Sequence, residues 1–335
     1  LQSRIRTEFP IDQMLPAAGQ GALGIEVRAD RVDLVEALRP LALPHLEKLL
    51  ARLTATLADT GPDDPLTPPH ERALARAYGL DAPDGGLPWA AWQARESGRD
   101  TAHGAGGQAW AWITPCHWRM GRDHILMLHP LALQLDAQDA RTLVDAMQPY
   151  FAQDGITLEY DAPTQWLARG EAFRGLATAS LDRVIGRDVN AWMARGGAAR
   201  TLRRLQSEMQ MLLYTHPVNE ARERGGLLPV NSFWVSGTGA LPPATGALPA
   251  GLRVPHYLRD AALRADWAAW ADAWRLLDTG ECARLLGELD AGRTVRLTLC
   301  GERSAQTFES LPKSLFRQLS SRLARTPLST WLDPL

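Results

Sequence analysis

Cysteine is scarce in this chain, which has three, Cys116, Cys282 and Cys300, among 335 residues. They are widely spaced, and no two of them form a Cys-x-x-Cys pair. An odd number of scattered cysteines does not fit a disulfide framework, and structural zinc sites draw on closely paired cysteines and histidines. We therefore expect neither a disulfide scaffold nor a zinc ribbon, and we place the protein in the reducing cytoplasm.

Lysine is almost absent, because Lys48 and Lys313 are the only lysines among 36 basic residues. The 38 acidic residues outnumber the basic ones and give a formal net charge of −2. A nucleic-acid-binding domain concentrates basic charge, whereas the arginine-rich stretch 169–204 has acidic residues interleaved with it. The sequence therefore predicts no nucleic-acid partner.

Long apolar runs are also missing. No stretch approaches the roughly 18 to 20 apolar residues that a membrane-spanning helix needs. A charged segment followed by an apolar one, which is typical of a secretion leader, does not open the chain. We expect no membrane association.

Hydrophobic spacing indicates the fold class. Alternating apolar positions predict strands at 109–112, 125–128, 156–160 and 295–299. Apolar residues three and four positions apart predict helices over 43–59, 137–151, 200–214, 257–277 and 312–324. Strands separated by helices favour an α/β fold, with a layered sheet and flanking helices.

The densest group of polar side chains lies between residues 114 and 129. Cysteine, histidine and aspartate are ligands of transition metals, but adjacent residues of an extended segment point to opposite faces, so we expect no metal here. Two arginines could instead bind a phosphate or carboxylate, with a histidine as acid or base. A third interpretation is a turn whose polar groups bond the backbone. The candidate residues are Cys116, His117, Arg119, Arg122, Asp123 and His124.

A second polar group spans residues 214–222 (YTHPVNEAR) and 228–239 (LPVNSFWVSGTG). Asparagines can hydrogen-bond neighbouring backbone, and Gly237 and Gly239 permit positive φ or close backbone approach. The pattern resembles a segment of the archaeal-type, cofactor-independent phosphoglycerate mutases, in which His-Pro-Val-Asn-x-x-Arg precedes Asn-x-x-Trp-x-x-Gly-x-Gly. It adds four candidate residues to a site for an anionic ligand: His216, Asn219, Arg222 and Asn231.

The phosphoglycerate mutase resemblance implies an alkaline-phosphatase-like core. Members of that family transfer phosphate through a serine nucleophile between two divalent metals, held by Asp and His ligands from both ends of the chain. No histidine follows His256, and Asp84-Gly85 and Asp154-Gly155 have the character of turns. We therefore expect a degenerate core with no catalytic activity and no cofactor. The alternative is an active, metal- or phosphate-dependent phosphoglycerate-mutase-like enzyme.

Six segments between residues 43 and 325 resemble the RpfE-type family of bacterial regulatory proteins, which are often labelled phosphoglycerate mutase. This resemblance implies a soluble regulatory or binding protein whose biochemical activity is unknown. Its expected partner is an anionic small molecule or a protein. The segments are 43–50 (LPHLEKLL), 114–118 (TPCHW), 121–124 (GRDH), 147–151 (MQPYF), 183–188 (RVIGRD) and 205–211 (LQSEMQM).

Residues 15–28 (LPAAGQGALGIEVR) resemble an internal segment of hydroxymethylbilane synthase, also called porphobilinogen deaminase. That family carries a dipyrromethane cofactor on a cysteine in a Gly-Gly-Cys context, which none of the three cysteines has. We expect a chimera with a junction near residue 41. Its parts would be a synthase-like fragment over 1–41, a helical region with Gly/Pro-rich loops over 42–107 and an α/β domain over 108–335. The alternative is a hydroxymethylbilane synthase of tetrapyrrole biosynthesis, a transferase.

Overall fold

The computed structural model describes residues 42–61, 64–100, 107–242 and 251–310. By internal contacts the chain divides into two units. The split unit comprises Leu1–Pro62 with Val254–Leu335, and the central unit comprises Asp63–Arg253. The 15–28 motif, the junction near residue 41 and the helix expected over 312–324 lie outside the described residues. The three expected domains stay a prediction, because they concern ancestry and these units are defined by contacts.

A three-stranded antiparallel sheet forms the split unit, with β9 (Ser304–Glu309) between β1 (Thr54–Thr60) and β8 (Arg296–Cys300). Its core brings leucines of α2 and residues of the α11–α12 segment against Phe308 of β9. Asp278 joins α2 to η5, because its carboxylate accepts hydrogen bonds from the Leu46 amide and His45 Nδ1, each at 2.8 Å. The other elements are α2 (Pro44–Arg52), α10 (Tyr257–Leu263), α11 (Trp267–Leu277), the π-helical η5 (Asp278–Cys282) and α12 (Ala283–Asp290).

Two helices expected in this unit differ from the observed ones. The helix predicted over 43–59 ends at Arg52, and the chain continues as β1 because it pairs with β9, far away in sequence. The helix predicted over 257–277 is interrupted at Ala265, which has a φ of 53°. Asp266 then begins a new helix, since its side chain accepts a hydrogen bond from the Ala269 amide at 2.9 Å.

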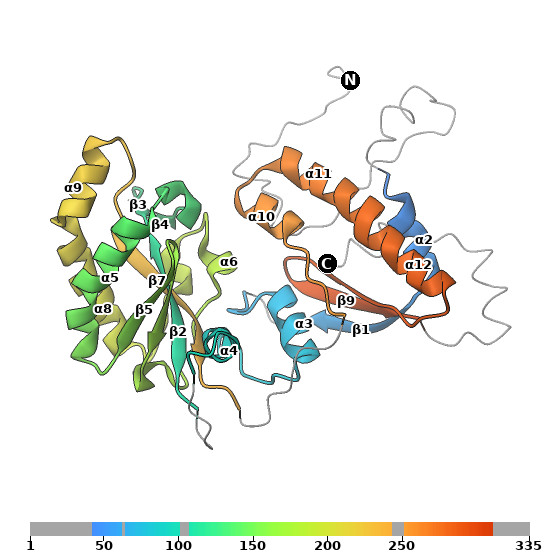
Figure 1. Cartoon of the computed structure of the whole chain (residues 1–335), viewed down its shortest axis with the longest axis horizontal. Helices are drawn as coiled ribbons and strands as arrows, with labels where there is room; N and C mark the ends of the chain where they lie inside the picture. The colour runs from blue at the N-terminus through green and yellow to red at the C-terminus, as the bar shows by residue number, and fades with distance from the viewer. Residues whose placement is uncertain (1–41, 62–63, 101–106, 243–250, 311–335) are drawn as a thin grey trace. The chain divides into compact units, whose positions relative to one another are not determined.

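The central unit contains a four-stranded antiparallel sheet in the order β5-β6-β2-β7. Figure 1 labels three of its strands, β2, β5 and β7. Helices α5 and α8 cover one face, where Ala111 and Ile113 of β2 enter the main core. Helix α4 packs on the other face against Trp110 of β2. The strands are β2 (Trp110–Cys116), β5 (Thr157–Ala162), β6 (Gln165–Arg169) and β7 (Ser232–Gly239), and the three helices are α4 (Trp89–Glu96), α5 (Ala137–Ala152) and α8 (Arg200–Tyr214).

A short hairpin of β3 (Trp118–Met120) and β4 (Ile125–Met127) follows β2 directly. It is the element on which the first polar group of the sequence lies. The remaining elements of the central unit are α3 (Pro69–Ala77), α6 (Leu181–Val184), α7 (Val189–Trp192), α9 (Pro217–Arg224) and the 3-10 turns η3 (Pro130–Leu133) and η4 (Glu171–Phe173).

The predicted layered α/β class is confirmed, with sheets flanked by helices in both units. All pairings between the named strands are antiparallel. The Gly-x-Gly of β7 shows both properties expected of it. Gly237 has a φ of 64°, and a Cβ there would lie 2.9 Å from the Trp112 ring and 3.2 Å from the Ala90 amide nitrogen. This glycine lets α4 pack closely on the sheet.

Within the ranges that the structure describes, no helix combines the length and the apolar character needed to cross a bilayer.

Candidate functional site

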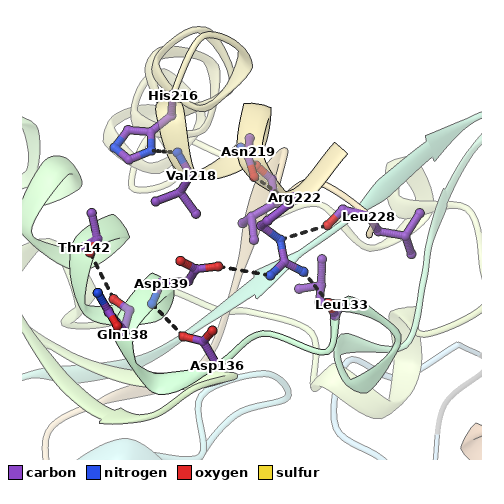
Figure 2. A network of polar contacts seen from close by, with 11 residues as sticks. Leu133, Asp136, Gln138, Asp139, Thr142, His216, Val218, Asn219, Arg222 and Leu228 are labelled. Atoms are coloured by element: carbon purple, nitrogen blue, oxygen red, sulfur yellow. Dashed lines mark hydrogen bonds and ion pairs between the residues drawn. The ribbon is translucent and has the colours of Figure 1, made fainter. Parts of the chain in front are cut away.

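Asn219 lies in α9 (Figure 2), and its side chain connects this helix to two other segments of backbone. Its side chain is buried and donates from Nδ2 to the carbonyls of Leu213, at 2.8 Å, and Val230, at 2.7 Å. Its Oδ1 accepts from the Val230 amide at 2.8 Å. Because these contacts use both amide protons and the oxygen, Asn219 joins the end of α8 to the segment that leads into β7 and offers little to a ligand.

Arg222, one turn further along α9, is buried as well, with 3% of its surface exposed. Its guanidinium donates to the carbonyls of Leu228, from Nε at 3.1 Å, and of Leu133. Its third partner is the Asp139 carboxylate of α5, at 3.4 Å (Figure 2). A buried cation needs such partners, and here they tie together α9, α5 and the η3 turn. The geometry therefore assigns Arg222 to the architecture of the unit.

His216 begins α9 as its N-cap residue. The imidazole Nδ1 accepts a hydrogen bond from the Val218 amide at 3.2 Å, so this nitrogen carries no proton. Burial lowers the pKa of His216 below its ordinary value, while the Asp139 carboxylate acts in the opposite direction. The capping role therefore uses the neutral form of the ring.

Asn231 connects the two polar groups of the sequence, which lie more than 100 positions apart. Its Oδ1 accepts from the Trp118 amide at 2.7 Å, and its Nδ2 donates to the Trp118 carbonyl at 2.9 Å. The Asn231 amide also donates to the Cys116 carbonyl at 3.2 Å. Its side chain thus pairs with β3 as a strand would, and it fixes the base of the β3–β4 hairpin.

Cys116 and His117, which also belong to the first polar group, lie near this base and have different surroundings. Cys116 is fully buried at the end of β2, and burial raises the pKa of its thiol, so the reactive thiolate is disfavoured. The His117 ring lies 2.9 Å from the Pro229 carbonyl through Nδ1. In the described part of the chain, no three or more His, Cys, Asp or Glu residues come together in a group that could hold a metal ion.

At the tip of the hairpin the remaining four candidates, Arg119, Arg122, Asp123 and His124, are all exposed. The Gly121 amide donates to the His124 carbonyl at 2.8 Å and closes the turn. Neither the Arg119 nor the Arg122 guanidinium forms a hydrogen bond or ion pair with any residue of the described ranges. The structure therefore brings two uncommitted guanidinium groups and an imidazole to one small turn.

Asp188 is a neighbour of this turn that sequence reasoning did not place in the site. Residues 185–188 pair with β4 through isolated bridges at Leu126 and Met127. The Asp188 carboxylate accepts from the Asn190 and Ile125 amides, each at 3.2 Å. These two hydrogen bonds, with a smaller contribution from His124, hold the pKa of Asp188 below its usual value. Aspartate before Val-Asn is an N-cap pattern, and that was the available signal.

Comparison with known proteins finds matches to porphobilinogen deaminases over parts of the chain, and no family model matches. The enzyme of Albidiferax ferrireducens is 64% identical over 42 residues, 12% of this chain and 13% of the relative. That of Burkholderia vietnamiensis is 32% identical over 151 residues, 44% of this chain and 39% of the relative. The longer match exceeds the segment expected to carry this resemblance. The chain thus spans well under two thirds of the relatives it matches.

Among solved structures, the chain is similar to the cofactor-independent phosphoglycerate mutase from Thermoplasma acidophilum, with a TM-score of 0.35 and 14% identity over 79% of this chain and 81% of that one. It is also similar to the PH0037 protein from Pyrococcus horikoshii, with a TM-score of 0.42 and 12% identity over 82% and 83% of the two chains. Similarity at this level carries no inference about activity. Two of the three resemblances seen in the sequence, to porphobilinogen deaminases and to phosphoglycerate mutases, are thus found again among known proteins. The RpfE-type resemblance stays a prediction.

Proposed function

We propose that this protein is a regulatory, non-catalytic binding protein that holds an anionic small molecule at the tip of the β3–β4 hairpin. The observation that carries the proposal is the pair of exposed, uncommitted guanidinium groups of Arg119 and Arg122. Guanidinium groups bind phosphates and carboxylates through paired N–H donors. The hairpin is also anchored at its base, through Asn231, so the two groups are presented on a fixed support.

The second polar group supports the same assignment, because its side chains already form hydrogen bonds within the protein. The side chains of Asn219 and Arg222 are saturated by backbone carbonyls and a carboxylate, and His216 caps α9. A ligand could reach Asn219 and Arg222 only by replacing contacts that hold the unit together. Of the ten candidates, the four exposed at the hairpin tip are therefore the accessible ones. The RpfE-type resemblance favours a regulatory role for such a binding event.

The proposal is tested by titrating inorganic phosphate into the 15N-labelled protein at low ionic strength. We expect the amide signals of residues 119–124 to shift. The double variant Arg119→Gln/Arg122→Gln should weaken phosphate binding about tenfold or more, because each hydrogen bond to a charged group contributes about 1.5 to 3 kcal/mol. Arg200→Gln is the matched control, since Arg200 is also exposed and also without a described ion pair.

Two results would contradict the proposal. One is the absence of any phosphate-dependent shift at the hairpin, and the other is equal weakening by the double variant and the control after correction for the number of charges removed. If phosphate fails to bind while the hairpin variants lose the binding of an acidic protein, the anion-binding function is wrong and a protein partner replaces it.

Catalytic inactivity needs its own test, because the phosphoglycerate mutases are the source of one resemblance. Phosphoglycerate mutase and phosphatase turnover should be measured with the wild-type protein in the presence of Mn²⁺. We expect rates equal to those of a heat-inactivated sample. A metal-dependent rate well above that background would overturn the non-catalytic assignment and favour the phosphoglycerate-mutase-like enzyme.

A second candidate, porphobilinogen deaminase, is favoured by the partial matches to those enzymes. Two of the three cysteines do not support it, since burial raises the pKa of Cys116 and, together with Asp278 and Glu281, raises that of Cys282 to about 12. Thiols of this kind are poor nucleophiles for attaching a cofactor. We expect incubation with porphobilinogen to give no bilane and the intact mass to show no added dipyrromethane. Either product would establish this second function.

A further inference from the structure

A small cavity in the central unit is lined by residues of β7 and of the N-terminal half of α8. Its volume is about 10 Å³, which is the space that one water molecule needs. Most of the wall is apolar and includes Trp192 and Trp234, and its two polar side chains are those of Thr178 and Gln206. A site of this size fits a water molecule rather than a metabolite, and the polar groups around it decide whether a water is held.

Gln206 brings one hydrogen-bond acceptor to this cavity. Its side chain is buried, with 4% of the residue exposed, and its Nε2 donates to the Phe233 carbonyl at 3.3 Å. Its Oε1 has no hydrogen-bond donor among the described residues. Because buried polar atoms of native proteins nearly always have a partner, in the protein or in an ordered water, this oxygen calls for a donor.

The Val235 amide is a buried donor that faces the same helix. Gln206 reaches the Phe233 carbonyl from α8, and the residue opposite Phe233 on β2 is Pro115, which has no N–H. The backbone groups of Phe233 therefore point away from β2. Alternate residues of an antiparallel strand point their backbone groups in the same direction, so the Val235 amide also faces α8. β7 is the edge strand of its sheet, and outside the ladder with β2 this amide has no acceptor among the described residues.

Thr178 supplies a second acceptor on the wall of the cavity. Its hydroxyl lies 3.0 Å from that of Thr238, and the Thr238 hydroxyl donates to the Leu176 carbonyl. Since Thr238 has used its only proton, Thr178 is the donor in the contact between the two hydroxyls. The Thr178 oxygen therefore keeps lone pairs for another donor. One amide proton and two oxygen acceptors thus surround a space of the size of a water.

We propose that this cavity is a binding site for one ordered water molecule, which bridges β7 and α8. The water accepts a hydrogen bond from the Val235 amide and donates its two protons to Gln206 Oε1 and Thr178 Oγ1. About three hydrogen bonds are typical of a buried water, and the three groups here supply that number. β7 begins directly after Asn231, so the bridge joins α8 to the strand next to the residue that fixes the base of the β3–β4 hairpin.

NMR spectroscopy of the 15N-labelled full chain tests the site through contacts between water and the Val235 amide. In the wild-type protein we expect a direct contact in rotating-frame Overhauser spectra, where its sign separates it from hydrogen exchange. Gln206→Met places an apolar side chain at the cavity and should abolish the contact, because the water loses an acceptor. Gln210→Met is the matched control and should keep the contact, since Gln210 lies one turn further along α8 and is not on the cavity wall.

A crystal structure of the wild-type protein gives a second measurement that depends on no variant. We expect electron density for a water at about 2.7 to 3.0 Å from both Gln206 Oε1 and the Val235 nitrogen. Absence of a water contact at the Val235 amide, or a direct hydrogen bond from this amide to Gln206 Oε1, overturns the site. A contact that survives in Gln206→Met, or that Gln210→Met abolishes equally, also overturns it.

Discussion

Substitution of Asn219 is the most direct test of whether a candidate residue stabilises the fold or binds the ligand. Replacing it by alanine removes three hydrogen bonds, at 2.7 to 2.8 Å, in a position that is 3% exposed. A typical buried hydrogen bond contributes about 1 kcal/mol, and a buried group left without its partner costs about 1 to 3 kcal/mol. We therefore expect Asn219→Ala to lower the free energy of unfolding of the central unit by about 3 kcal/mol, a large part of the 5 to 15 kcal/mol typical of a domain.

The measurement should follow the central unit by itself, because a chain with two units need not unfold in one step. Hydrogen exchange of the Val230 amide, whose acceptor is Asn219 Oδ1, reports directly on the lost contact. Chemical denaturation of the same sample gives the free energy of unfolding. Glu220→Ala is the control, since Glu220 is the exposed neighbour on α9 and should change stability by less than about 0.5 kcal/mol.

The reasoning fails if Asn219→Ala is as stable as the control variant. Unchanged stability combined with lost phosphate binding would make Asn219 a ligand-binding residue, contrary to the assignment here. Asn219→Asp adds a second check, because a carboxylate cannot donate to the two carbonyls that Asn219 serves. It should destabilise the unit at neutral pH more than alanine does, and the difference should shrink as the acid protonates.

Three further predictions concern stability. Gly237→Ala should lower the free energy of unfolding by about 1 to 3 kcal/mol, because Gly237 combines a φ of 64° with a Cβ position 2.9 Å from the Trp112 ring. Gly226→Ala is the control for the backbone strain alone, since Gly226 has a φ of 73° and open space around its Cβ position. The pKa of His216 lies below its ordinary value of 6.5, so the unfolded chain binds the proton more readily than the folded one. The free energy of unfolding should therefore fall as the pH drops below 6.5. His216→Asn keeps an N-cap acceptor and should remove this part of the pH dependence. Gln206→Met should lower the free energy of unfolding by about 1 to 3 kcal/mol in chemical denaturation, because it removes the hydrogen bond from the buried Gln206 Nε2 to the Phe233 carbonyl at 3.3 Å and leaves that carbonyl without this donor. Unchanged stability would show that this hydrogen bond contributes nothing.

Local signals in the sequence predicted local structure well. Asp136 begins α5 as an N-cap, with its side chain accepting from the Asp139 amide at 2.8 Å, and the helix runs to Ala152 as the apolar spacing indicates. The leucine spacing that predicted a helix over 43–59 was misleading beyond Arg52. Leu57, which lies within that predicted range, is 47% exposed on β1. Its strand conformation depends on pairing with β9, a partner that no local pattern reveals.

The sequence predicted which residues of the candidate site could bond the backbone or an anion, but it did not predict how these residues are arranged in space. The sequence indicated that Asn219 and Asn231 could bond the backbone and that Arg119 and Arg122 could bind an anion. It could not show that Asn231 supports the very hairpin that carries those arginines, because the Trp118 contact spans 113 positions. Nor could it show that Arg222 is buried against Leu133 and Asp139, since both partners come from segments more than 80 positions earlier.

The pairing of β1 with β9 has a consequence for the order of events during synthesis. Thr54 lies opposite Glu309, so about 250 residues must leave the ribosome before the sheet of the split unit can close. The residues from 64 to 242 contain a complete sheet with helices on both faces and can fold while translation continues. During that interval the leucines of α2 lack the residues of α12 and β9 that pack against them in the finished unit, and contacts between segments so far apart in sequence form slowly.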